Sequence, residues 1–582
     1  MEELFIRINM NKLEVNYEIV PEKYRKMGGR WLTSQLVCEE IPSTSHPLGP
    51  NNKLVFAPGI VTGTRAPCSG RMSVGSKSPL TDEIRESNVG SPVAIALAKM
   101  GIKGIIVEGQ PKEKDKLWIL RLTNKGNGIL EPAAELKGMG LYELAKSIRK
   151  KYGKANFIAI GPAGERCMSI AGICFSDKDG RPSRYAGRGG LGAVMGTKGL
   201  KAIIVEDPGT SRLKKIVDQD LFRTGERKLV EALKKHRFTK PGGILNSYGL
   251  TFLVDVLNEI GALPTCNFRK GSFEGANKIS AKAIAETIKQ RNGSGKTGHS
   301  CHRGCIIKCS VIWPKPNGIE HVSSLHYESL WALGVNCGID DIDAIAEMIW
   351  MCNDNGLDTI EAGIALGLAM EAGLINFGDV QGAIRLLKEC VQGTTLGRVL
   401  GNGAALTSKI LGVTRVPAVK GMGMPGYDPR ALKGLGVTYL TSPMAADHTA
   451  GYTVVTEVFG IGNEAILLSS ENKVELSKNY QAITAFLDAT GYCLFILFAI
   501  LNDSSGLEGM VDTVNGVLGT NWTTKEIVDI GRRIIALECS FNAKAHKRLP
   551  EFMYDEPLSS HWSCYDVLLD EEPDKIWKGQ QK

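Results

Sequence analysis

The pattern of apolar residues changes near residue 208, and this change limits the folds that the chain can adopt. Before that point, short apolar runs are bounded by glycine, proline or charged residues, which is typical of strands. The predicted strands are 54–57, 104–108, 117–120, 157–160 and 202–205. Helices are predicted at 92–100 and 141–152, the second with a basic C-terminal end. We therefore predict a β-rich domain over residues 1–208.

Helical periodicity dominates the rest of the chain. Amphipathic helices are predicted at 217–235, 281–290, 339–355, 359–372, 379–392, 473–489 and 524–549. A segment rich in glycine and proline, 416–436, separates the first five of these from the last two. The pattern predicts an α+β chain in which two mostly α-helical domains, 209–415 and 416–582, follow the β-rich domain.

Composition and charge exclude several classes of protein. Hydrophobic residues make up 43% of the chain and charged residues 23%, which excludes global disorder. The net charge of +8 is small for 582 residues and spread along the chain, so no nucleic-acid partner is expected. The charge gives only a mild preference for acidic partners. The 67 glycines lie in short aperiodic clusters, which indicates many tight turns.

Nothing in the sequence predicts a membrane span or a leader. The longest late apolar run, 493–501, has nine residues, whereas a spanning helix needs about 20. The N-terminus begins acidic and alternates like a strand, so no signal peptide is expected. We expect a soluble, cytoplasmic protein whose 14 cysteines stay reduced, which directs clustered cysteines toward metal binding or catalysis.

Three cysteines, Cys301, Cys305 and Cys309, follow one another at gaps of three residues. This spacing brings their side chains to one helix face or into one compact loop. A [4Fe–4S] cluster takes four cysteines, so a distant cysteine would have to complete the set. The spacing leaves two alternatives open, which are zinc with His299 or His302 as fourth ligand, and ordinary buried cysteines.

Two segments of the helical regions share one pattern, in which an aspartate or asparagine is followed three residues later by glycine. The first repeat, 353–358, contains Asn353 and Gly356. The second repeat, 488–493, contains Asp488 and Gly491. A glycine that ends a helix would leave backbone groups free for a ligand, beside polar side chains able to hydrogen-bond a heterocycle. Two copies indicate two halves of one ligand or two ligands, and Cys493 is the candidate for the fourth cluster cysteine.

Two nucleotide-binding motifs are incomplete. The segment 187–192 matches G-x-G-x-x-G, but no strand is predicted before it, and Gly196 and Gly199 interrupt any long helix after it. The segment 295–297 resembles the end of a P-loop but lacks the required earlier glycine, because that position is Gln290. We expect neither a dinucleotide site nor a P-loop.

A further set of motifs runs along essentially the whole chain. It consists of Gly70-Arg71, 77–81, 88–90, 184–196, the three clustered cysteines, 327–334, the first repeat, 427–430, Asp447-His448 and the second repeat. Each motif alone is unspecific. Together and in this order, they resemble the family of tungsten-containing aldehyde:ferredoxin oxidoreductases.

The resemblance implies the cofactors and fold of that family. One tungsten, or molybdenum, is held between two pyranopterin dithiolenes without a covalent ligand from the protein. A [4Fe–4S] cluster beside one pterin passes electrons to ferredoxin. The β-rich domain would seat this bis-pyranopterin on its sheets, and the two helical domains would close over it.

The resemblance also implies residue roles, position by position. Cys301, Cys305, Cys309 and Cys493 would be the cluster ligands. The pterin rings would be contacted by Asn353, Leu357, Asp358, Asp488 and Tyr492, and the pterin phosphates by Arg71 and Arg184. The carbonyls of Asn88 and Tyr185 would bind the Mg²⁺ that bridges those phosphates. The glycine-containing motifs would add Gly90, Gly187 and Gly189 to the cofactor-binding residues.

Glu328 and His448 match the family's acid–base pair. In the implied reaction an aldehyde gains an oxygen atom and the metal takes up two electrons, which leave one at a time through the cluster. Glu328 would move the proton, and His448 would orient or polarise the carbonyl oxygen. Taken from the residues alone, Glu328 could instead be a carboxylate at a helix start and His448 a loop histidine, but these are the less favoured alternatives.

The chain departs from the family pattern at several positions. The first cysteine gap is three residues instead of two, so the loop before Cys305 is one residue longer. Asn353 stands where an aspartate is expected, Tyr492 replaces a leucine and Ala450 replaces a lysine. Residues 347–350 lack the Glu-x-x-His stretch of members with a metal at the dimer interface. A homodimer, if formed, is therefore expected to have no bridging metal.

Three functions follow. The first is oxidation of a small-molecule aldehyde to a carboxylic acid, with electrons passed to ferredoxin or another iron–sulfur carrier. The second is another reaction of the same superfamily, such as reduction of an aromatic acyl-CoA, which the departures around His448 and Tyr492 keep open. The third belongs to a different class, a zinc-stapled, non-catalytic subunit of a redox complex. The sequence favours the first.

Overall fold

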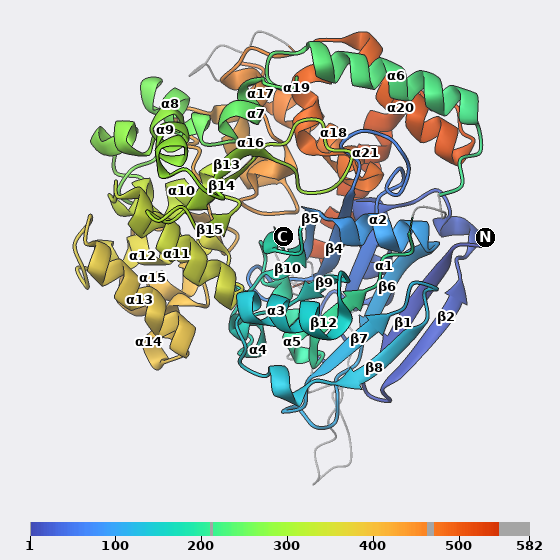
Figure 1. Ribbon diagram of the computed structural model, residues 1–582, viewed down its shortest axis with the longest axis horizontal. Coiled ribbons are helices and arrows are strands. Elements are labelled where there is room, and N and C mark those ends of the chain that lie inside the picture. The colour runs from blue at the N-terminus through green and yellow to red at the C-terminus, as the bar shows by residue number, and fades with distance from the viewer. Residues whose placement is uncertain (1, 210–213, 463–470, 546–582) are drawn as a thin grey trace, which may run out of the picture.

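The computed structural model describes residues 2–209, 214–462 and 471–545. Two six-stranded sheets form the N-terminal region, and the region after them is mostly helical. Figure 1 shows the sheets in blue to cyan at the lower right, with helices in green to red to their left and above them. The predicted α+β class is therefore confirmed.

The two sheets share one apolar core. The first has the strand order β2-β1-β6-β3-β4-β5 and the second the order β11-β10-β9-β12-β7-β8. Their strands are β1 Leu4–Asn9, β2 Glu14–Ile19, β3 Leu54–Pro58, β4 Arg71–Lys77, β5 Ile84–Gly90, β6 Ile102–Glu108, β7 Trp118–Leu122, β8 Gly128–Pro132, β9 Asn156–Ala159, β10 Ile173–Ser176, β11 Pro182–Ala186 and β12 Leu200–Val205. Buried side chains of both sheets, such as Phe56 and Ile158, pack together with those of α2 (Pro92–Lys99). Burial of this shared layer fixes one sheet against the other.

Two antiparallel hairpins bring predicted cofactor residues together. β4 pairs with β5, so that Arg71 lies opposite Gly90. Asn88 lies opposite Ser73, two residues along β4 from Arg71. β10 pairs with β11, which carries Arg184 and Tyr185. Because β5 contacts β11, the two hairpins form one continuous wall that faces the helical regions.

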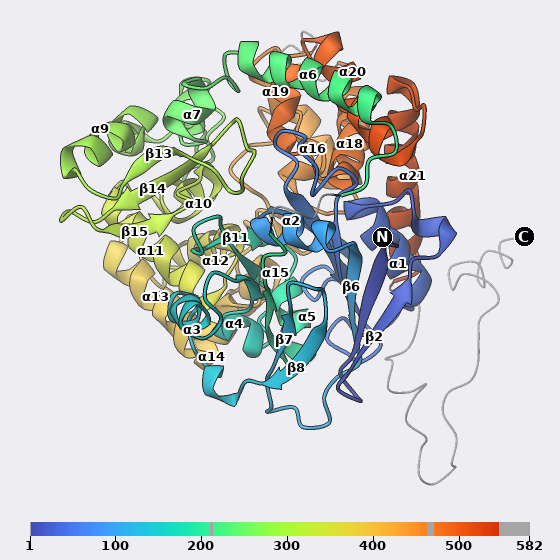
Figure 2. The same ribbon diagram turned by 45° about the vertical axis from the view of Figure 1, so that its right-hand side comes forward.

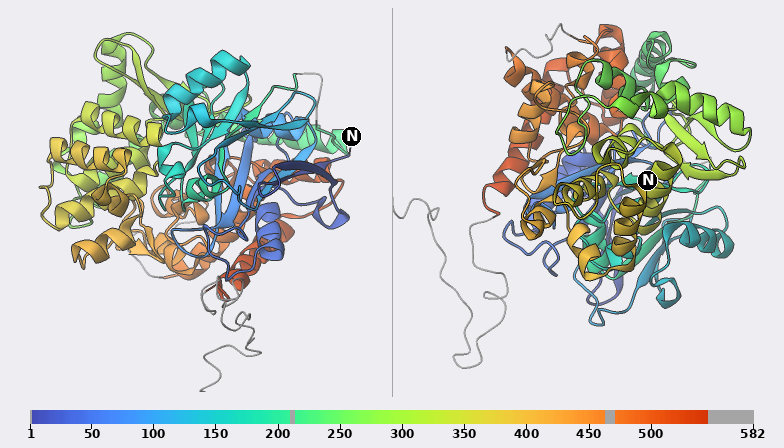
Figure 3. Two further views of the ribbon diagram at one scale, coloured as in Figure 1. Left: turned by 90° about the horizontal axis from the view of Figure 1, so that it is seen from below. Right: turned by 90° about the vertical axis from the view of Figure 1, so that its left-hand side faces the viewer.

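The helices lie in two groups on different sides of the sheets, as the further views show (Figures 2 and 3). The helices are α1 Gly29–Glu40, α3 Leu141–Tyr152, α4 Pro162–Glu165, α5 Leu191–Thr197, α6 Gln219–Lys235, α7 Ile244–Tyr248, α8 Phe252–Glu259, α9 Ala281–Arg291, α10 Tyr327–Leu333, α11 Ile342–Asn355, α12 Thr359–Glu371, α13 Val380–Gln392, α14 Thr395–Leu400, α15 Ala404–Leu411, α16 Lys433–Thr441, α17 Val454–Glu457, α18 Lys473–Thr490, α19 Leu497–Ile500, α20 Ser504–Leu518 and α21 Thr524–Asn542. Elements far apart in sequence pack together, because α6 lies along α20 and α1 packs on β4, α18 and α21. The division at residues 208 and 415 stays a prediction.

The helices predicted by periodicity are present. α6, α9, α11, α12, α13 and α18 match the predicted helices, with ends that differ by three residues at most. The predicted helix 524–549 begins correctly but ends at Asn542, and residues 546–549 lie outside the described residues. Apolar periodicity predicts these helices well because each buries one face against a common core.

The sequence missed the strands that carry the cofactor motifs. β4, β5, β10 and β11 were not predicted. Polar residues interrupt the apolar patterns of β4, β5 and β11, whereas β10 has only four residues. The expectation of no strand before 187–192 is wrong, since β11 ends at Ala186 and α5 follows. The conclusion drawn from it still holds, because β10 and β11 are antiparallel and α5 has seven residues, so the segment is not part of a parallel βαβ unit.

Both repeats end a helix at a left-handed glycine that packs on the sheet region. Gly356 ends α11 with φ of 73°, and Gly491 ends α18 with φ of 88°. A Cβ atom on Gly161 would lie 2.3 Å from the backbone of Asn355, and one on Gly59 would lie 2.2 Å from Cα of Gly491. Backbone therefore meets backbone at both contacts, which only glycine permits.

No helix within the described residues is long and apolar enough to cross a membrane.

Replacing Gly491 with alanine tests the second contact. The new Cβ atom would lie 2.2 Å from Oγ1 of Thr62 in addition to requiring a left-handed backbone, whereas Gly412→Ala requires the same backbone with nothing within 4 Å. The control should lose about 1–2 kcal/mol of stability, and Gly491→Ala should lose clearly more. Thermal unfolding of the two purified variants measures this difference. Equal falls in the unfolding midpoint would show that the contact with the sheet is unimportant.

Candidate functional site

The four predicted cluster cysteines lie together where the hairpin wall meets the helices. Cys301, Cys305 and Cys309 occupy the loop between β13 (Lys296–His299) and β14 (Ser310–Pro314), and Cys493 follows α18 after two residues. Cys301 interacts electrostatically with each of the other three thiols. Its Sγ lies against β5, because a Cβ atom on Gly90 would come within 3.1 Å of it. Four thiols from two segments, of which that of Cys305 is buried, form a donor set that suits an iron–sulfur cluster.

A fifth cysteine, which sequence reasoning missed, belongs to the same group. Cys68 is fully buried and interacts electrostatically with Cys305. Its N–H donates to the carbonyl of Gly304 at 3.1 Å, and its carbonyl accepts from the N–H of Cys493 at 2.9 Å. The segment around Cys68 therefore ties the cysteine loop to the end of α18. Its position two residues before the Gly70-Arg71 motif was the only available signal.

The histidines considered as zinc ligands have other partners. Nδ1 of His302 lies 2.7 Å from the carbonyl of Arg303, and its Nε2 accepts from the N–H of Gly70 at 3.2 Å. Nε2 of His299 lies 2.9 Å from Oδ2 of Asp179. A zinc site would have to break contacts that the fold already makes, so the geometry favours an all-cysteine site.

Two arginines place positive charge beside the thiols. Arg71 donates through Nε to the side chain of Asn88 and through Nη2 to its carbonyl at 3.3 Å. Arg184 is buried, and its Nε and Nη2 have no hydrogen-bond partner among the described residues. Both arginines interact electrostatically with Cys301. A buried guanidinium with unsatisfied donors fits a site for an anionic group such as a phosphate.

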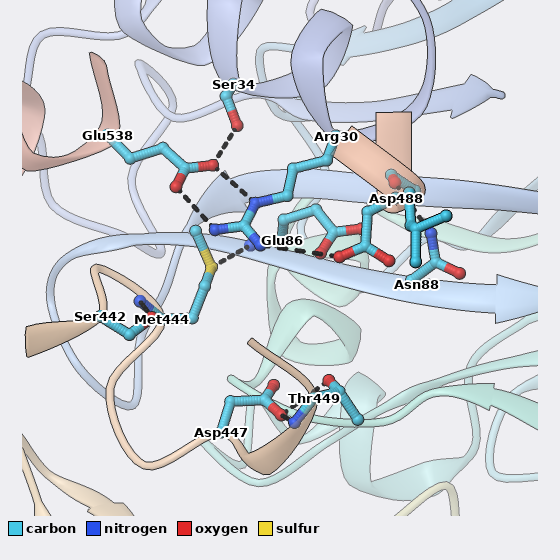
Figure 4. Close-up of polar contacts among 12 residues, drawn as sticks. Arg30, Ser34, Glu86, Asn88, Ser442, Met444, Asp447, Thr449, Asp488 and Glu538 are labelled. Atoms are coloured by element: carbon cyan, nitrogen blue, oxygen red, sulfur yellow. Dashed lines mark hydrogen bonds and ion pairs between the residues drawn. The ribbon is translucent and has the colours of Figure 1, made fainter. Parts of the chain in front are cut away.

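Asp488 in the second repeat faces a buried arginine. Arg30 of α1 donates to Glu538 of α21 through Nε at 2.9 Å and Nη2 at 2.8 Å, while its Nη1 lies 3.6 Å from Oδ2 of Asp488. Figure 4 shows this array, with Glu86 of β5 beside it. Burial and the charge of Glu86 raise the pKa of Asp488 well above its ordinary value, and burial also raises the pKa of Glu86. Carboxyl groups that keep a proton can both donate to and accept from a heterocycle.

Asp358 in the first repeat has a similar neighbourhood. Arg188, between β11 and α5, lies with Nε 3.4 Å from Oδ2 of Asp358 and Nη2 3.3 Å from Oε1 of Glu361. It also donates to the carbonyls of Ala446 and Gly423, each at 2.6 Å. Burial raises the pKa of Asp358, and it raises that of Glu361 to about 7. The two repeats thus present an aspartate in the same chemical setting.

The other predicted ring contacts are engaged within the protein. The carbonyl of Asn353 accepts from Tyr185 Oη at 2.6 Å. Leu357 forms an isolated antiparallel bridge to the sheet region. Tyr492 is fully buried, and its hydroxyl lies 2.7 Å from that of Thr513 on α20. The side chain of Tyr492 therefore packs into the helical core, which leaves its backbone for any ligand contact.

The glycines of 187–192 have different neighbours. A Cβ atom on Gly189 would meet the side chain of Arg85, and one on Gly190 would lie 2.4 Å from the carbonyl of Ser169. A Cβ atom on Gly187 would meet only Cβ of Tyr185, at 3.7 Å. Close packing within the protein therefore explains Gly189 and Gly190. Gly187 alone borders space that a ligand could use.

Glu328 and His448 meet at the start of α10. Nε2 of His448 lies 3.3 Å from Oε1 of Glu328, and Tyr427 Oη donates to the same oxygen at 3.1 Å. The ring of Tyr427 stacks on that of His448 at 5.2 Å between centroids. Burial alone would raise the pKa of Glu328, but the hydrogen bond and charge of His448 outweigh it and hold the pKa below its ordinary value. Glu328 is thus a carboxylate with a preformed proton-transfer contact.

The carboxylate of Asp447 lies beside this histidine, whose Nδ1 has no hydrogen-bond partner among the described residues. Its carboxylate pairs with Arg85 and lies 3.8 Å from Nδ1 of His448. Burial opposes its ionisation, but the charges of Arg85 and Arg188 hold its pKa far below the ordinary value. Asp447 also accepts hydrogen bonds from the N–H and hydroxyl of Thr449 (Figure 4). Asp447, next to His448, is therefore anchored to Arg85 of β5.

Several buried polar atoms near these groups have no hydrogen-bond partner among the described residues. Those of the hairpin wall and of the segment before α10 are Arg85 Nε, Glu86 Oε1, Ser183 Oγ, Arg184 Nε and Nη2, and His326 Nδ1, as judged over the described residues. Burial and Arg184 lower the pKa of His326 to about 4, so it is neutral. Native proteins rarely leave such atoms unpaired. These residues fit a large polar ligand that carries negative charge.

Sequence models of one family match most of the chain. The model described as "Aldehyde ferredoxin oxidoreductase, N-terminal domain" matches residues 5–207, and that described as "Aldehyde ferredoxin oxidoreductase, domains 2 & 3" matches residues 226–571. The chain belongs to the aldehyde ferredoxin oxidoreductase family. It is therefore an oxidoreductase, and the family implies a tungsten–pterin cofactor.

Individual relatives agree with this assignment. The chain is 33% identical over 581 residues to the "Tungsten-containing aldehyde ferredoxin oxidoreductase" of Pyrococcus furiosus, which covers 95% of this chain and 91% of the relative. It is 25% identical over 570 residues to the "Aliphatic sulfonate oxidoreductase, WOR-like subunit" of the same organism, covering 91% of this chain and 84% of the relative. Among solved structures, the active site complex BamBC of benzoyl coenzyme A reductase with 1,5-dienoyl-CoA superposes with a TM-score of 0.77 at 18% identity, covering 94% and 90% of the two chains. That last likeness is one of fold.

Proposed function

We propose that this protein is a tungsten or molybdenum bis-pyranopterin enzyme that oxidises aldehydes to carboxylic acids and passes the electrons through a [4Fe–4S] cluster to ferredoxin. The observation that carries the proposal is the contact of 3.3 Å between His448 and Glu328, beside Tyr427 and Tyr452. The 33% identity to a tungsten-containing aldehyde ferredoxin oxidoreductase supports the substrate class.

The described residues supply the contacts that such a cofactor needs. Asp358 and Asp488 would bind the two pterin rings, aided by backbone groups at Asn353, Leu357 and Tyr492. Arg71 and Arg184 would bind the pterin phosphates, and the carbonyls of Asn88 and Tyr185 would bind a bridging Mg²⁺. Cys301, Cys305, Cys309 and Cys493 would hold the cluster. When bound, the metal centre supplies the two-electron acceptor that aldehyde oxidation requires.

The chain's own residues position the substrate and move its proton. The overall reaction joins an aldehyde and water to give a carboxylic acid, two electrons and two protons. Glu328, held as a carboxylate, accepts a proton at Oε1. The N–H of His448 donates to the carbonyl oxygen and so orients it, while the stacked ring of Tyr427 supports the imidazole. The aromatic rings of Tyr427, Tyr452 and Phe495 line one side of this pair and exclude water.

A basic cleft beside the cysteine loop supports an acidic electron acceptor. The cleft has a volume of about 960 Å³, and Arg303 and Gly304, next to Cys305, form part of its wall. Its charged residues are Arg65, Lys99, Arg149, Lys154, Lys178, Arg181, Lys296 and Arg303, against Asp179 and Asp207. We propose that ferredoxin, or another small acidic iron–sulfur carrier, docks there. Complementary charge would speed the encounter and place the carrier close to the cluster.

Residues 347–350, where no bridging metal is expected, pack against other parts of the same chain. Trp350 stacks on Tyr142 with centroids 5.5 Å apart and lies beside His321 at 6.3 Å. Glu347 pairs with the same histidine at 3.1 Å. These contacts support a protein whose dimer, if formed, has no metal between subunits.

The described cysteines are all free thiols, which supports a reducing, cytoplasmic location.

Reduction of an aromatic acyl-CoA is the second candidate. Ala450 replaces the lysine expected beside the pterin, and the likeness in fold to a benzoyl coenzyme A reductase shows that this architecture accommodates that chemistry. The purified, metal-replete protein distinguishes the two candidates. Viologen reduction by aldehydes supports the first, whereas turnover of an aromatic acyl-CoA with all aldehydes inert supports the second.

Glu328→Gln should remove the proton acceptor without disturbing the cofactors. We expect turnover of aldehyde to fall by about 10²-fold or more, with tungsten or molybdenum and iron contents unchanged. Glu371→Gln, which alters a surface pair with Arg269, is the matched control and should keep full turnover. Wild-type turnover in Glu328→Gln would make Glu328 a structural carboxylate.

Arg303→Glu should weaken docking of the carrier and spare the chemistry. We expect the KM for the oxidised carrier to rise about tenfold at low salt, which is equivalent to about 1.4 kcal/mol. Viologen reduction by aldehyde should be unchanged. Lys388→Glu, on an exposed position of α13, is the charge-matched control. The same KM for carrier in both variants would place the docking surface elsewhere.

A further inference from the structure

The turn that leads into His448 contains a strained residue. Within this turn, 442–447, Ala445 has φ of 55°. A left-handed backbone is unfavourable for a residue with a Cβ atom, and alanine lacks the polar side chain with which asparagine or aspartate offsets the cost. The N–H of Asp447 donates to the carbonyl of Ala445 at 2.8 Å, so the chain is tightly bent at this point. The surrounding structure must therefore hold the turn in place.

Two arginines hold the turn on either side of Ala445. Nη1 of Arg85 on β5 donates to the carbonyl of Met444 at 2.8 Å. Nη1 of Arg188, two residues after β11, donates to the carbonyl of Ala446 at 2.6 Å. No other donor reaches either carbonyl within the described part of the chain. Because both turn residues are buried, loss of either arginine would leave a buried carbonyl unpaired.

The guanidinium groups of both arginines are themselves held in place. Both arginines are buried, and Nη2 of Arg85 also pairs with the carboxylate of Asp447. Met444 and Asp447, the two partners of Arg85, lie along one loop in Figure 4. Nη2 of Arg188 likewise donates to the carbonyl of Gly423 at 2.6 Å. Each planar fork therefore presents its donors at fixed spacings, which the single ammonium group of a lysine cannot do.

We propose that Arg85 and Arg188 are positioning residues that clamp the strained turn 442–447 and thereby hold His448 against Glu328. This inference rests on the proposed function, in which that pair orients the substrate and moves its proton. The arginines act through the backbone, because His448 directly follows the turn and its Nε2 lies 3.3 Å from Oε1 of Glu328. Without the clamp, the turn would relax from its left-handed conformation, and the imidazole would move with it.

Turnover and amide hydrogen exchange of the full-length, metal-replete protein test the clamp. Arg85→Lys keeps a positive charge beside Asp447 but cannot reach the carbonyl of Met444 at the same time. We expect kcat for aldehyde to fall about tenfold with KM unchanged, because a left-handed alanine is disfavoured by about that factor when nothing holds it. Amide exchange over residues 442–448, followed by mass spectrometry, should become about tenfold faster.

Relief of the strain should rescue this variant. Glycine adopts a φ of 55° without the penalty, so adding Ala445→Gly to Arg85→Lys should return kcat to within about threefold of the wild type and restore slow exchange. Ala446→Gly is the matched control, because the neighbouring Ala446 is outside the left-handed region, and it should give no rescue. A role of Arg85 in general stability would not respond to the residue at position 445.

Arg291→Lys is the control for loss of an arginine fork. Arg291 on α9 donates through Nη1 to the carbonyl of Pro314 at 2.7 Å and pairs through Nη2 with Asp343 at 2.5 Å. It thus has the same two kinds of partner as Arg85. Its replacement should leave kcat and the exchange of residues 442–448 unchanged.

The unfolding midpoint and the metal content show whether each variant folds. If Arg85→Lys does not fold, Arg188→Lys loosens the other side of the turn and takes its place in the comparison. The same loss of kcat, the same faster exchange and the same rescue by Ala445→Gly are then expected.

Three outcomes would overturn the proposal. Wild-type kcat and exchange in Arg85→Lys would show that the turn needs no clamp. A loss of kcat that Ala445→Gly does not relieve would show that Arg85 acts in another way. Equal rescue by Ala446→Gly would indicate general loosening of the loop instead of relief of strain. Amide exchange does not depend on turnover, so a protein that is inert to every aldehyde but shows the expected exchange would refute the proposed function and support the clamp.

Discussion

A buried arginine between two carboxylates joins the first and last parts of the chain. Arg30 has 1% of its surface exposed, so its charge must be compensated inside the protein. Glu538 compensates it with two hydrogen bonds, and Ser34 donates to the same carboxylate at 2.7 Å. Removing one partner of such a pair costs about 3–5 kcal/mol. This pair fixes α1 to α21, and it leaves one arginine nitrogen toward Asp488, which sets the position of the second repeat.

The site is built from the same arrangement twice. Each repeat ends a helix at a left-handed glycine seated on sheet-region backbone, and each presents an aspartate to a buried arginine that also faces a glutamate. The pairs are Asp488 with Arg30 and Asp358 with Arg188. Burial raises the pKa of both aspartates, so each can act as donor and acceptor. Two equivalent half-sites suit a ligand with two equivalent heterocycles. Asp447, next to His448, interacts electrostatically with both half-sites, and the cysteines lie near Arg71.

The sequence predicted the helices and most of the residues that meet at the site. Helical periodicity placed α11 and α18 correctly because their apolar faces are continuous, and the repeats at their ends could be recognised from glycine spacing. The strands β4 and β5 were not predicted because polar side chains at the candidate site interrupt their apolar patterns. Arg30, Glu86 and Cys68 escaped for another reason, since their importance comes from neighbours distant in sequence. Arg30 lies 508 residues from Glu538, and no local pattern encodes that contact.

Bound metals in anaerobically purified protein, from a host able to make the pterin cofactor, test most directly whether the paired half-sites and the thiols hold redox cofactors. Mass spectrometry would measure tungsten, molybdenum, iron, magnesium and zinc per chain. We predict about four irons with one tungsten or molybdenum, together with magnesium. Zinc as the only bound metal, with no pterin released on oxidation, would contradict the proposed enzyme and make the cysteines a structural staple.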